Sequence, residues 1–152
     1  AAASIIAQAA LDGVPEIDVI ARKGHSWGET EKVVERVNAG TDCKICMYEL
    51  ADQVQMKKSI EDSAILVNAS SVGMSPHEDS CLVPDQTFFH PELIVSDVIY
   101  NPRKTKLLRM AEDVGCSTFN GMYMLLYQGA YAFELWTGHE MPVGLVKEKY
   151  FS

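Results

Sequence analysis

The sequence predicts an α/β fold built on a doubly wound, mostly parallel sheet with helices on both faces. Short apolar segments of strand length alternate with longer segments whose apolar residues recur at helical spacing, which is typical of β-α-β units. Several short segments are apolar without alternation, so we expect both faces of the sheet to be covered. With 47% hydrophobic and 22% charged residues, the 152-residue length fits one globular domain over residues 1–152.

In the first part of the chain, helices and strands alternate from the beginning. A helix is expected over residues 1–11, where apolar residues recur at helical spacing, and a strand rich in Ile and Val over 16–21. Three valines share one face of a helix over 29–38, which Gly40 is expected to end. Then follow a strand over 43–48, a polar helix over 51–60 and an apolar strand over 63–68.

The second part continues the alternation after one long irregular segment, residues 69–89. Loops of that length in a compact domain are usually functional or mobile. The remaining elements are expected as a strand over 93–100, a helix over 104–114 closed by Gly115, a strand over 116–119, and helices over 121–137 and 143–151. Most aromatic side chains of the helix over 121–137 are expected to be core or packing residues.

Composition excludes several classes of function. Thirteen basic and twenty-one acidic residues give a formal charge of −8, which argues against binding to nucleic acid. No apolar run approaches the roughly 18 residues that cross a membrane, and no basic residue precedes the apolar start as in a signal peptide. Four cysteines are too few for a disulfide scaffold, so we expect a reducing, cytoplasmic location.

Neither metal-binding nor catalytic motifs are evident. Cys43 and Cys46 form a C-x-x-C pair, but on a strand residues three apart point to opposite faces. No second pair completes a zinc site, and the four histidines have no ligand spacing. The chain also lacks a nucleophile elbow, a P-loop and an evident acid–base pair, so no catalytic residue and no metal ligand is predicted.

In open α/β sheets, ligands bind beyond the carboxyl ends of the strands. Arg22, Lys23 and Gly24 follow the strand over 16–21, where a dinucleotide fold would carry an acidic residue for a ribose 2′-hydroxyl. Basic residues there would instead receive a 2′-phosphate, so a bound cofactor would be NADP in preference to NAD. The alternative interpretation is an ordinary solvated turn.

Two other segments follow strands, and one polar residue lies in an apolar helix. Residues 68–74 (NASSVGM) combine small side chains, hydroxyls and a glycine, which suit close approach to a flat ring, although an ordinary turn has the same composition. Pro102 favours an extended chain before it and brings Tyr100 near the cleft. Among small and apolar neighbours, the amide of Gln128 must be hydrogen-bonded, either to nearby backbone or to a ligand.

Taken together, these segments resemble the shikimate dehydrogenase family, and most closely its quinate/shikimate branch. Three blocks occur in the family's order: NASSVGM over 68–74; Asp97 through Pro102 with Thr105 and Leu107; and NGMYMLLYQ over 120–128 with FELWTG beyond. The resemblance implies a Rossmann-like domain that binds NADP or NAD. The implied reaction is reversible hydride transfer between this cofactor and 3-dehydroshikimate or 3-dehydroquinate in aromatic amino acid biosynthesis. In the family a catalytic Lys–Asp pair lies in a preceding domain, and nothing in this chain matches it.

The resemblance also implies roles for individual residues. Ala1 corresponds to the end of a glycine loop that holds the pyrophosphate, and Ala21, Arg22, Lys23 and Gly24 to the adenosine end. The family's usual Asn-Arg-Thr is Ala-Arg-Lys here, so the choice between NADP and NAD stays open. Ser71, Val98, Ile99, Tyr100, Asn101 and Gly121 would surround the nicotinamide, while Tyr100 and Gln128 would contact shikimate or quinate. Tyr123 stands where the family usually has glycine, and its ring would either crowd the nicotinamide or point away from it.

The chain begins with an uncapped helix and no strand before it, which suggests a truncated domain lacking its first strand and glycine loop. Loss of that central strand would leave two unpaired edges. We therefore expect a rearranged sheet, pairing with another chain or in a homo-oligomer, or further residues upstream. The fragment itself is expected to be inactive. Two rival hypotheses are a stand-alone α/β ligand-binding or regulatory module and a methyltransferase, whose Asn-Pro-Pro-aromatic motif the sequence matches only superficially.

Overall fold

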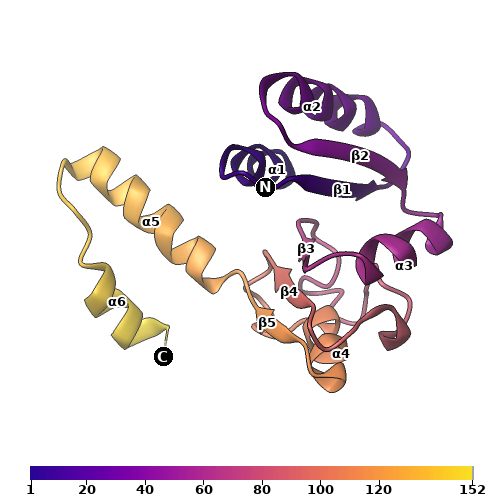
Figure 1. Ribbon diagram of the computed structural model, residues 1–152. Coiled ribbons are helices and arrows are strands. Elements are labelled where there is room, and N and C mark those ends of the chain that lie inside the picture. Colours follow the sequence, from indigo (N-terminus) through magenta and orange to yellow (C-terminus); the bar gives the residue numbers. More distant parts are fainter. Residues whose placement is uncertain (152) are drawn as a thin grey trace. The chain divides into compact units, whose positions relative to one another are not determined.

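The computed structural model describes residues 1–151, so Ser152, the last residue of the predicted domain, lies outside the described part (Figure 1). The chain divides into two compact units, one over Ala1–Ser63 and one from Ala64 onward. Each unit contains parallel strands with helices packed against them. No helix among residues 1–151 combines the length and apolar character needed to cross a bilayer.

The first unit contains a two-stranded parallel sheet and three helices. Its elements are α1 (Ala2–Leu11), β1 (Glu16–Ala21), α2 (Trp27–Gly40), β2 (Lys44–Glu49) and α3 (Gln53–Glu61). β1 and β2 pair in register from Glu16 opposite Lys44 to Ala21 opposite Glu49. The helices α1 and α2 share a core with residues of the strands. The buried residues of this core are Ile6, Ala10, Val34, Cys43 and Ile45, and the partly buried Ile17, Val19, Val37 and Met47 pack against them.

The strand residues that alternate with these core residues point to the opposite face of the β1-β2 sheet. Asp18 accepts a hydrogen bond of 2.5 Å from the hydroxyl of Ser59 on α3, so α3 packs on the opposite face from α1 and α2. Cys46 is the register partner of Asp18, whereas Cys43 lies in the core, where burial raises the pKa of its thiol. The two thiols therefore diverge, as expected for a strand, and both are free. Among the described residues, no group of His, Cys, Asp and Glu is arranged to hold a metal ion.

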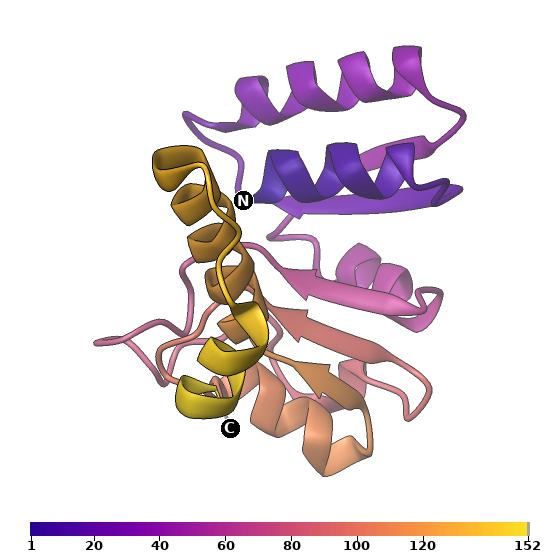
Figure 2. The ribbon, with the colours of Figure 1, turned by 90° about the vertical axis from the view of Figure 1, so that its left-hand side faces the viewer.

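The second unit is built around a three-stranded parallel sheet, whose strands run side by side in Figure 2. Its elements are β3 (Ile65–Asn68), the 3-10 helix η1 (Gln86–Phe88), β4 (Ile94–Asp97), α4 (Lys106–Val114), β5 (Ser117–Phe119), α5 (Met122–Thr137) and α6 (Val143–Tyr150). The strand order is β3-β4-β5, and the central strand contains the fully buried Val95. Leu107, Leu108 and Ala111 on α4 are buried, and α4 contacts both β4 and β5.

The predicted α/β class, with parallel sheets and flanking helices, is confirmed, and every predicted element is present. The five strands form two sheets, β1-β2 and β3-β4-β5, so the described residues do not complete the single sheet of a doubly wound domain. This agrees with the expectation that a central strand is missing from these residues. Gly115 closes α4 with a left-handed φ of 96°, as expected, whereas Gly40 is the last residue of α2 and not its stop.

Two predictions about side chains and boundaries were wrong. The strand expected over 93–100 ends at Asp97, because the N–H of Ile99 donates to the Asp97 carboxylate and not to a neighbouring strand. Most aromatic residues of α5 were expected to be core or packing residues, yet Tyr131 and Trp136 are 78% and 80% exposed. Leu126 is the buried residue of α5, and α6 is the element packed against this helix, so most of its surface has no cover within the described unit (Figure 1).

Candidate functional site

A cavity of about 340 Å³ opens at the carboxyl ends of β3 and β4 in the second unit. The loop after β3 and the loop after β4 supply its walls, which is where parallel α/β sheets bind ligands. Eight residues line it: Ser70, Ser71, Met74, Ser75, Val98, Ile99, Tyr100 and Asn101. The cavity thus brings together five residues that the sequence predicted for a nicotinamide site.

The loop after β3 is held in shape by its own side chains. Asn68 accepts hydrogen bonds at its Oδ1 from the backbone N–H of Ser70 at 3.1 Å and from the Ser70 hydroxyl at 2.7 Å. The same Ser70 hydroxyl oxygen accepts from the N–H of Val72 at 3.1 Å, and the Asn68 amide donates to the Val72 carbonyl at 3.2 Å. These bonds close the turn around a buried Asn68 and leave Ser71 exposed at the cavity.

Asp97, at the end of β4, joins both loops. Its side chain is 1% exposed and accepts three hydrogen bonds: from the Asn68 amide at 3.1 Å, from the Ile99 N–H at 3.0 Å and from the Thr105 hydroxyl at 2.7 Å. Thr105 in turn caps α4 by accepting from the N–H of Leu108 at 3.4 Å. One buried carboxylate therefore fixes the β3 loop, the β4 loop and the start of α4.

Gly121 brings the start of α5 against the loop after β4. Its N–H donates to the carbonyl of Ile99 at 2.9 Å. A Cβ at this position would overlap the carbonyl oxygen of Val98 and lie 2.5 Å from the carbonyl carbon. Only glycine allows this close approach of two backbones. Gly121 does not line the cavity itself but contacts two residues that do.

The lining of the cavity consists mainly of neutral polar and apolar side chains. Tyr100 is the one ionisable residue among the eight that line it, and its ring is 46% exposed. Serine hydroxyls, one asparagine amide and apolar side chains make up the rest. Such a surface can hold a flat ring and orient it by hydrogen bonds, but it offers no carboxylate, lysine or histidine for proton transfer.

The predicted adenosine residues lie in the first unit. Ala21 ends β1, and Arg22, Lys23 and Gly24 are exposed in the turn that follows. The Nζ of Lys23 lies 2.5 Å from Oε1 of Glu49. Hydrogen bonding to Glu49 and its negative charge raise the pKa of Lys23. Ala1 is the exposed residue before α1 and provides no side-chain cap.

The predicted substrate residue Gln128 lies on α5, outside the cavity lining. It is exposed, so water can satisfy its amide in the chain as described. Tyr123 has its ring 4.9 Å from the ammonium of Lys147 on α6, a cation–π distance. The phenol is thus engaged by α6 and is not part of the cavity lining.

Three buried polar residues of this network were not among the predicted site residues: Asn68, Asp97 and Thr105. All three occur in the motif blocks that resemble the family. The sequence could have indicated two of them, because Asn68 and Asp97 place an amide and a carboxylate at the ends of apolar strands. Their partnership depends on tertiary structure, since Asn68 and Asp97 are 29 positions apart.

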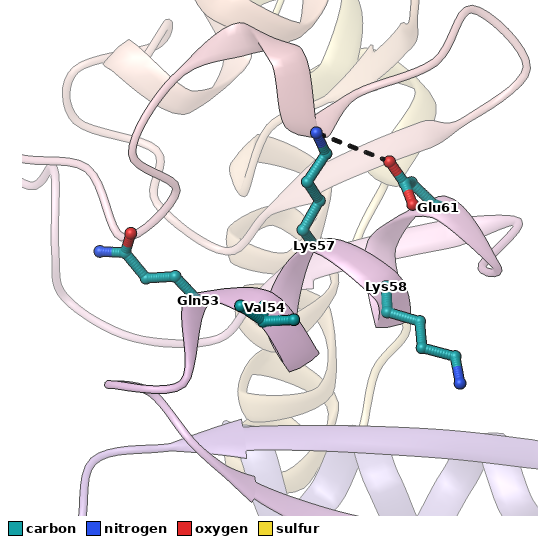
Figure 3. A pocket seen from close by; sticks show the side chains of 5 residues that line it. All are labelled: Gln53, Val54, Lys57, Lys58 and Glu61. Atoms are coloured by element: carbon teal, nitrogen blue, oxygen red, sulfur yellow. Dashed lines mark ion pairs between the residues drawn. The ribbon is translucent and has the colours of Figure 1, made fainter.

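A second hollow, of about 430 Å³, lies along α3 in the first unit (Figure 3). Gln53, Val54, Lys57, Lys58 and Glu61 line it, and Lys57 and Glu61 form an ion pair of 3.8 Å. All five residues come from successive turns of one helix, as the sticks in Figure 3 show. This hollow is a charged helix surface rather than a site at which separate elements converge.

Parallel strands with flanking helices, and the similarity in fold to the solved structures below, define the chain as a Rossmann-like α/β protein. The family described as "Shikimate 5'-dehydrogenase C-terminal domain" matches residues 121–149. The shikimate dehydrogenase (NADP(+)) of Listeria monocytogenes serotype 4b (strain F2365) is 50% identical over 151 residues, which cover 99% of this chain and 52% of the relative. The enzyme of the same name from Streptococcus uberis is 42% identical over 153 residues.

Solved structures agree with these relatives. The crystal structure of shikimate 5-dehydrogenase from Listeria monocytogenes in complex with shikimate and NAD superposes with a TM-score of 0.89 at 50% identity, over 97% of this chain and 52% of that one. The fold is shared by 5-ketofructose reductase of Gluconobacter, with a TM-score of 0.76 at 24% identity. Over nearly its whole length the chain is therefore similar to about half of a shikimate dehydrogenase, and residues 121–149 match the model of the C-terminal domain of that family. It spans about half the length (52%) of the curated relatives it matches.

Proposed function

We propose that residues 1–152 form the NAD(P)-binding domain of an oxidoreductase that transfers a hydride between NAD(P) and shikimate or quinate and their 3-dehydro forms. The observation that carries this proposal is the cavity at the ends of β3 and β4. It is lined by the residue blocks that resemble the family's nicotinamide site. Relatives named for NADP(+), and a neighbouring structure that holds NAD and shikimate, support the same cofactor and substrate class.

The residues present fit a nicotinamide. Gly121 allows the start of α5 to approach the Val98 carbonyl, and the serine turn provides hydroxyl donors beside apolar side chains. In this proposal Val98, Ile99 and Asn101 hold and orient the ring, Ser71 contacts it from the opposite loop, and Tyr100 also faces substrate. The bound cofactor supplies the hydride, while this domain fixes where its ring lies.

In this proposal, the residues that transfer the proton belong to a domain other than this chain. The cavity lining holds no carboxylate, lysine or histidine. The family resemblance places a Lys–Asp pair in a preceding domain. Gln128, exposed on α5, is proposed to donate to a substrate hydroxyl when that domain is present. The 152-residue chain alone therefore binds and positions but does not catalyse.

A chimera tests this function. We expect the chain alone to oxidise neither shikimate nor quinate with NADP or NAD. Joined to the part of the Listeria monocytogenes enzyme outside the aligned 52%, it should restore oxidation, followed by the absorbance of reduced nicotinamide. That part alone is the control. Activity of the isolated chain would refute the proposal that this chain binds the cofactor while another domain supplies the proton-transfer residues. A folded chimera that binds cofactor without turnover would favour a binding or regulatory module.

Removal of the Arg22 charge should weaken recognition of a 2′-phosphate. Arg22 is exposed beside the carboxyl end of β1, and a guanidinium there can donate two parallel hydrogen bonds to a phosphate. Loss of charge-assisted bonds of about 1.5–3 kcal/mol predicts about tenfold or greater loss of affinity for adenosine 2′-monophosphate in Arg22→Gln. Titration by NMR chemical shifts measures it, with Arg36→Gln on α2 as an exposed control. Unchanged affinity in Arg22→Gln would remove Arg22 from the site.

A further inference from the structure

The two basic side chains after β1 have different surroundings. The ammonium of Lys23 forms an ion pair of 2.5 Å with Glu49, and their side chains remain 69% and 43% exposed. Glu49 is the last residue of β2 and stands opposite Ala21, the last residue of β1. Among the ion pairs of residues 1–151, none includes Arg22. The turn therefore presents one free cation and one that is already paired.

We propose that Glu49 is a specificity-determining residue that lowers the preference for a 2′-phosphate over a 2′-hydroxyl. This inference rests on the proposed function, in which the turn after β1 receives the adenosine end of the cofactor. With Glu49 ionised, Arg22, Lys23 and Glu49 carry a net charge of +1 in place of the +2 of the two cations. A dianionic phosphate at this turn meets a weaker positive potential and a lysine held by a competing carboxylate. A neutral hydroxyl is nearly insensitive to both.

The exposure of the pair makes this effect measurable without loss of the fold. Exposed ion pairs contribute little to stability, so Glu49→Gln should leave the β1-β2 sheet intact. The same substitution releases Lys23 and removes a negative charge near the phosphate. For a charge change at this range in a solvated site, we expect affinity for a 2′-phosphate to rise about threefold to tenfold.

The same two strands offer a matched control. Lys44 and Glu16 form an exposed ion pair of 2.8 Å at the amino ends of β2 and β1. Glu16→Gln changes the net charge by the same amount on the same sheet. The register places the two pairs five residues apart along the strands, about 16 Å, which exceeds the Debye length of about 8 Å at physiological ionic strength. A general effect of net charge would appear in both variants, and a local one only in Glu49→Gln.

The experiment titrates the 152-residue chain and its variants with adenosine 2′-monophosphate and adenosine 5′-monophosphate. These probes have the same charge and differ only in the position of the phosphate. NMR chemical shifts give the affinities, and circular dichroism checks that each variant is folded. We expect Glu49→Gln to gain threefold to tenfold for the 2′ isomer and less than twofold for the 5′ isomer. Glu16→Gln should change neither, and Lys23→Gln combined with Glu49→Gln should return to the wild-type ratio.

Three results would overturn the inference. These are an unchanged 2′-to-5′ affinity ratio in Glu49→Gln, an equal gain in Glu16→Gln, and a gain that persists in the double variant. If the wild-type chain binds neither monophosphate saturably, the adenosine site of the proposed function fails together with the inference. Binding to wild type with no effect of Glu49→Gln refutes the role of Glu49 alone. The two failures are therefore distinguishable.

Discussion

Gly121→Ala is expected to destabilise the second unit by about 2–4 kcal/mol, because an added methyl group would overlap two backbones. Its Cβ would lie 2.5 Å from the carbonyl carbon of Val98 and 3.0 Å from that of Ile99. Both neighbours are main chain, so no flexible side chain can move aside. Relief requires the start of α5 to shift, which also stretches the hydrogen bond of 2.9 Å from Gly121 to Ile99. Urea unfolding of the 152-residue chain measures the loss.

The control for this substitution lies in the same helix. A Cβ at Gly129, inside α5, would meet no atom within 4 Å. Gly129→Ala should therefore stabilise the chain by about 0.5–1 kcal/mol through helix propensity alone. Opposite signs for the two glycine substitutions would attribute the damage to the contact with Val98. An unfolding free energy for Gly121→Ala within about 0.5 kcal/mol of wild type would contradict the close approach.

Local sequence predicted the elements well because apolar spacing is a local property. The strand over 16–21 and the helix over 104–114 occur at β1 and α4 with boundaries within two residues. The end of β4 was missed because it depends on a tertiary bond, from the Ile99 N–H to the Asp97 carboxylate. Spacing also could not show that α5 leaves Tyr131 and Trp136 exposed. The cover of a helix depends on which other elements are present.

For the candidate site too, the sequence indicated some residues, whereas those that meet only through tertiary contacts were missed. The family resemblance implied Ser71 and Val98 to Asn101 as site residues, and they line one cavity. The network behind them could not be predicted, because Asn68, Asp97 and Thr105 meet only when β3, β4 and α4 are assembled. The residues that line the cavity follow strand ends, whereas Asn68, Asp97 and Thr105, which hold those loops in place, are buried between elements.

Asp97→Ala is expected to lower the free energy of unfolding by about 3–5 kcal/mol, because it leaves three buried donors without an acceptor at once. The Asn68 amide, the Ile99 N–H and the Thr105 hydroxyl would each lose an acceptor now at 2.7–3.1 Å, in a place with 1% exposure. An exposed pair would lose little, since water could replace the partner. Asp113→Ala, on the exposed side of α4, removes a carboxylate of the same type and should change stability by less than about 0.5 kcal/mol.

Asp97→Ala also shows whether Asp97 holds the cavity loops in particular or only stabilises the second unit as a whole. Thr105 caps α4 and Asn68 shapes the serine turn, so loss of Asp97 should loosen both walls of the cavity before the unit unfolds. Hydrogen exchange of the amides over 68–74 and 98–101 should therefore accelerate more than that of the amides of α4 beyond its first turn. A uniform acceleration across the second unit would mean that Asp97 supports stability alone. Unchanged exchange together with unchanged stability would show that the three hydrogen bonds do not hold the site.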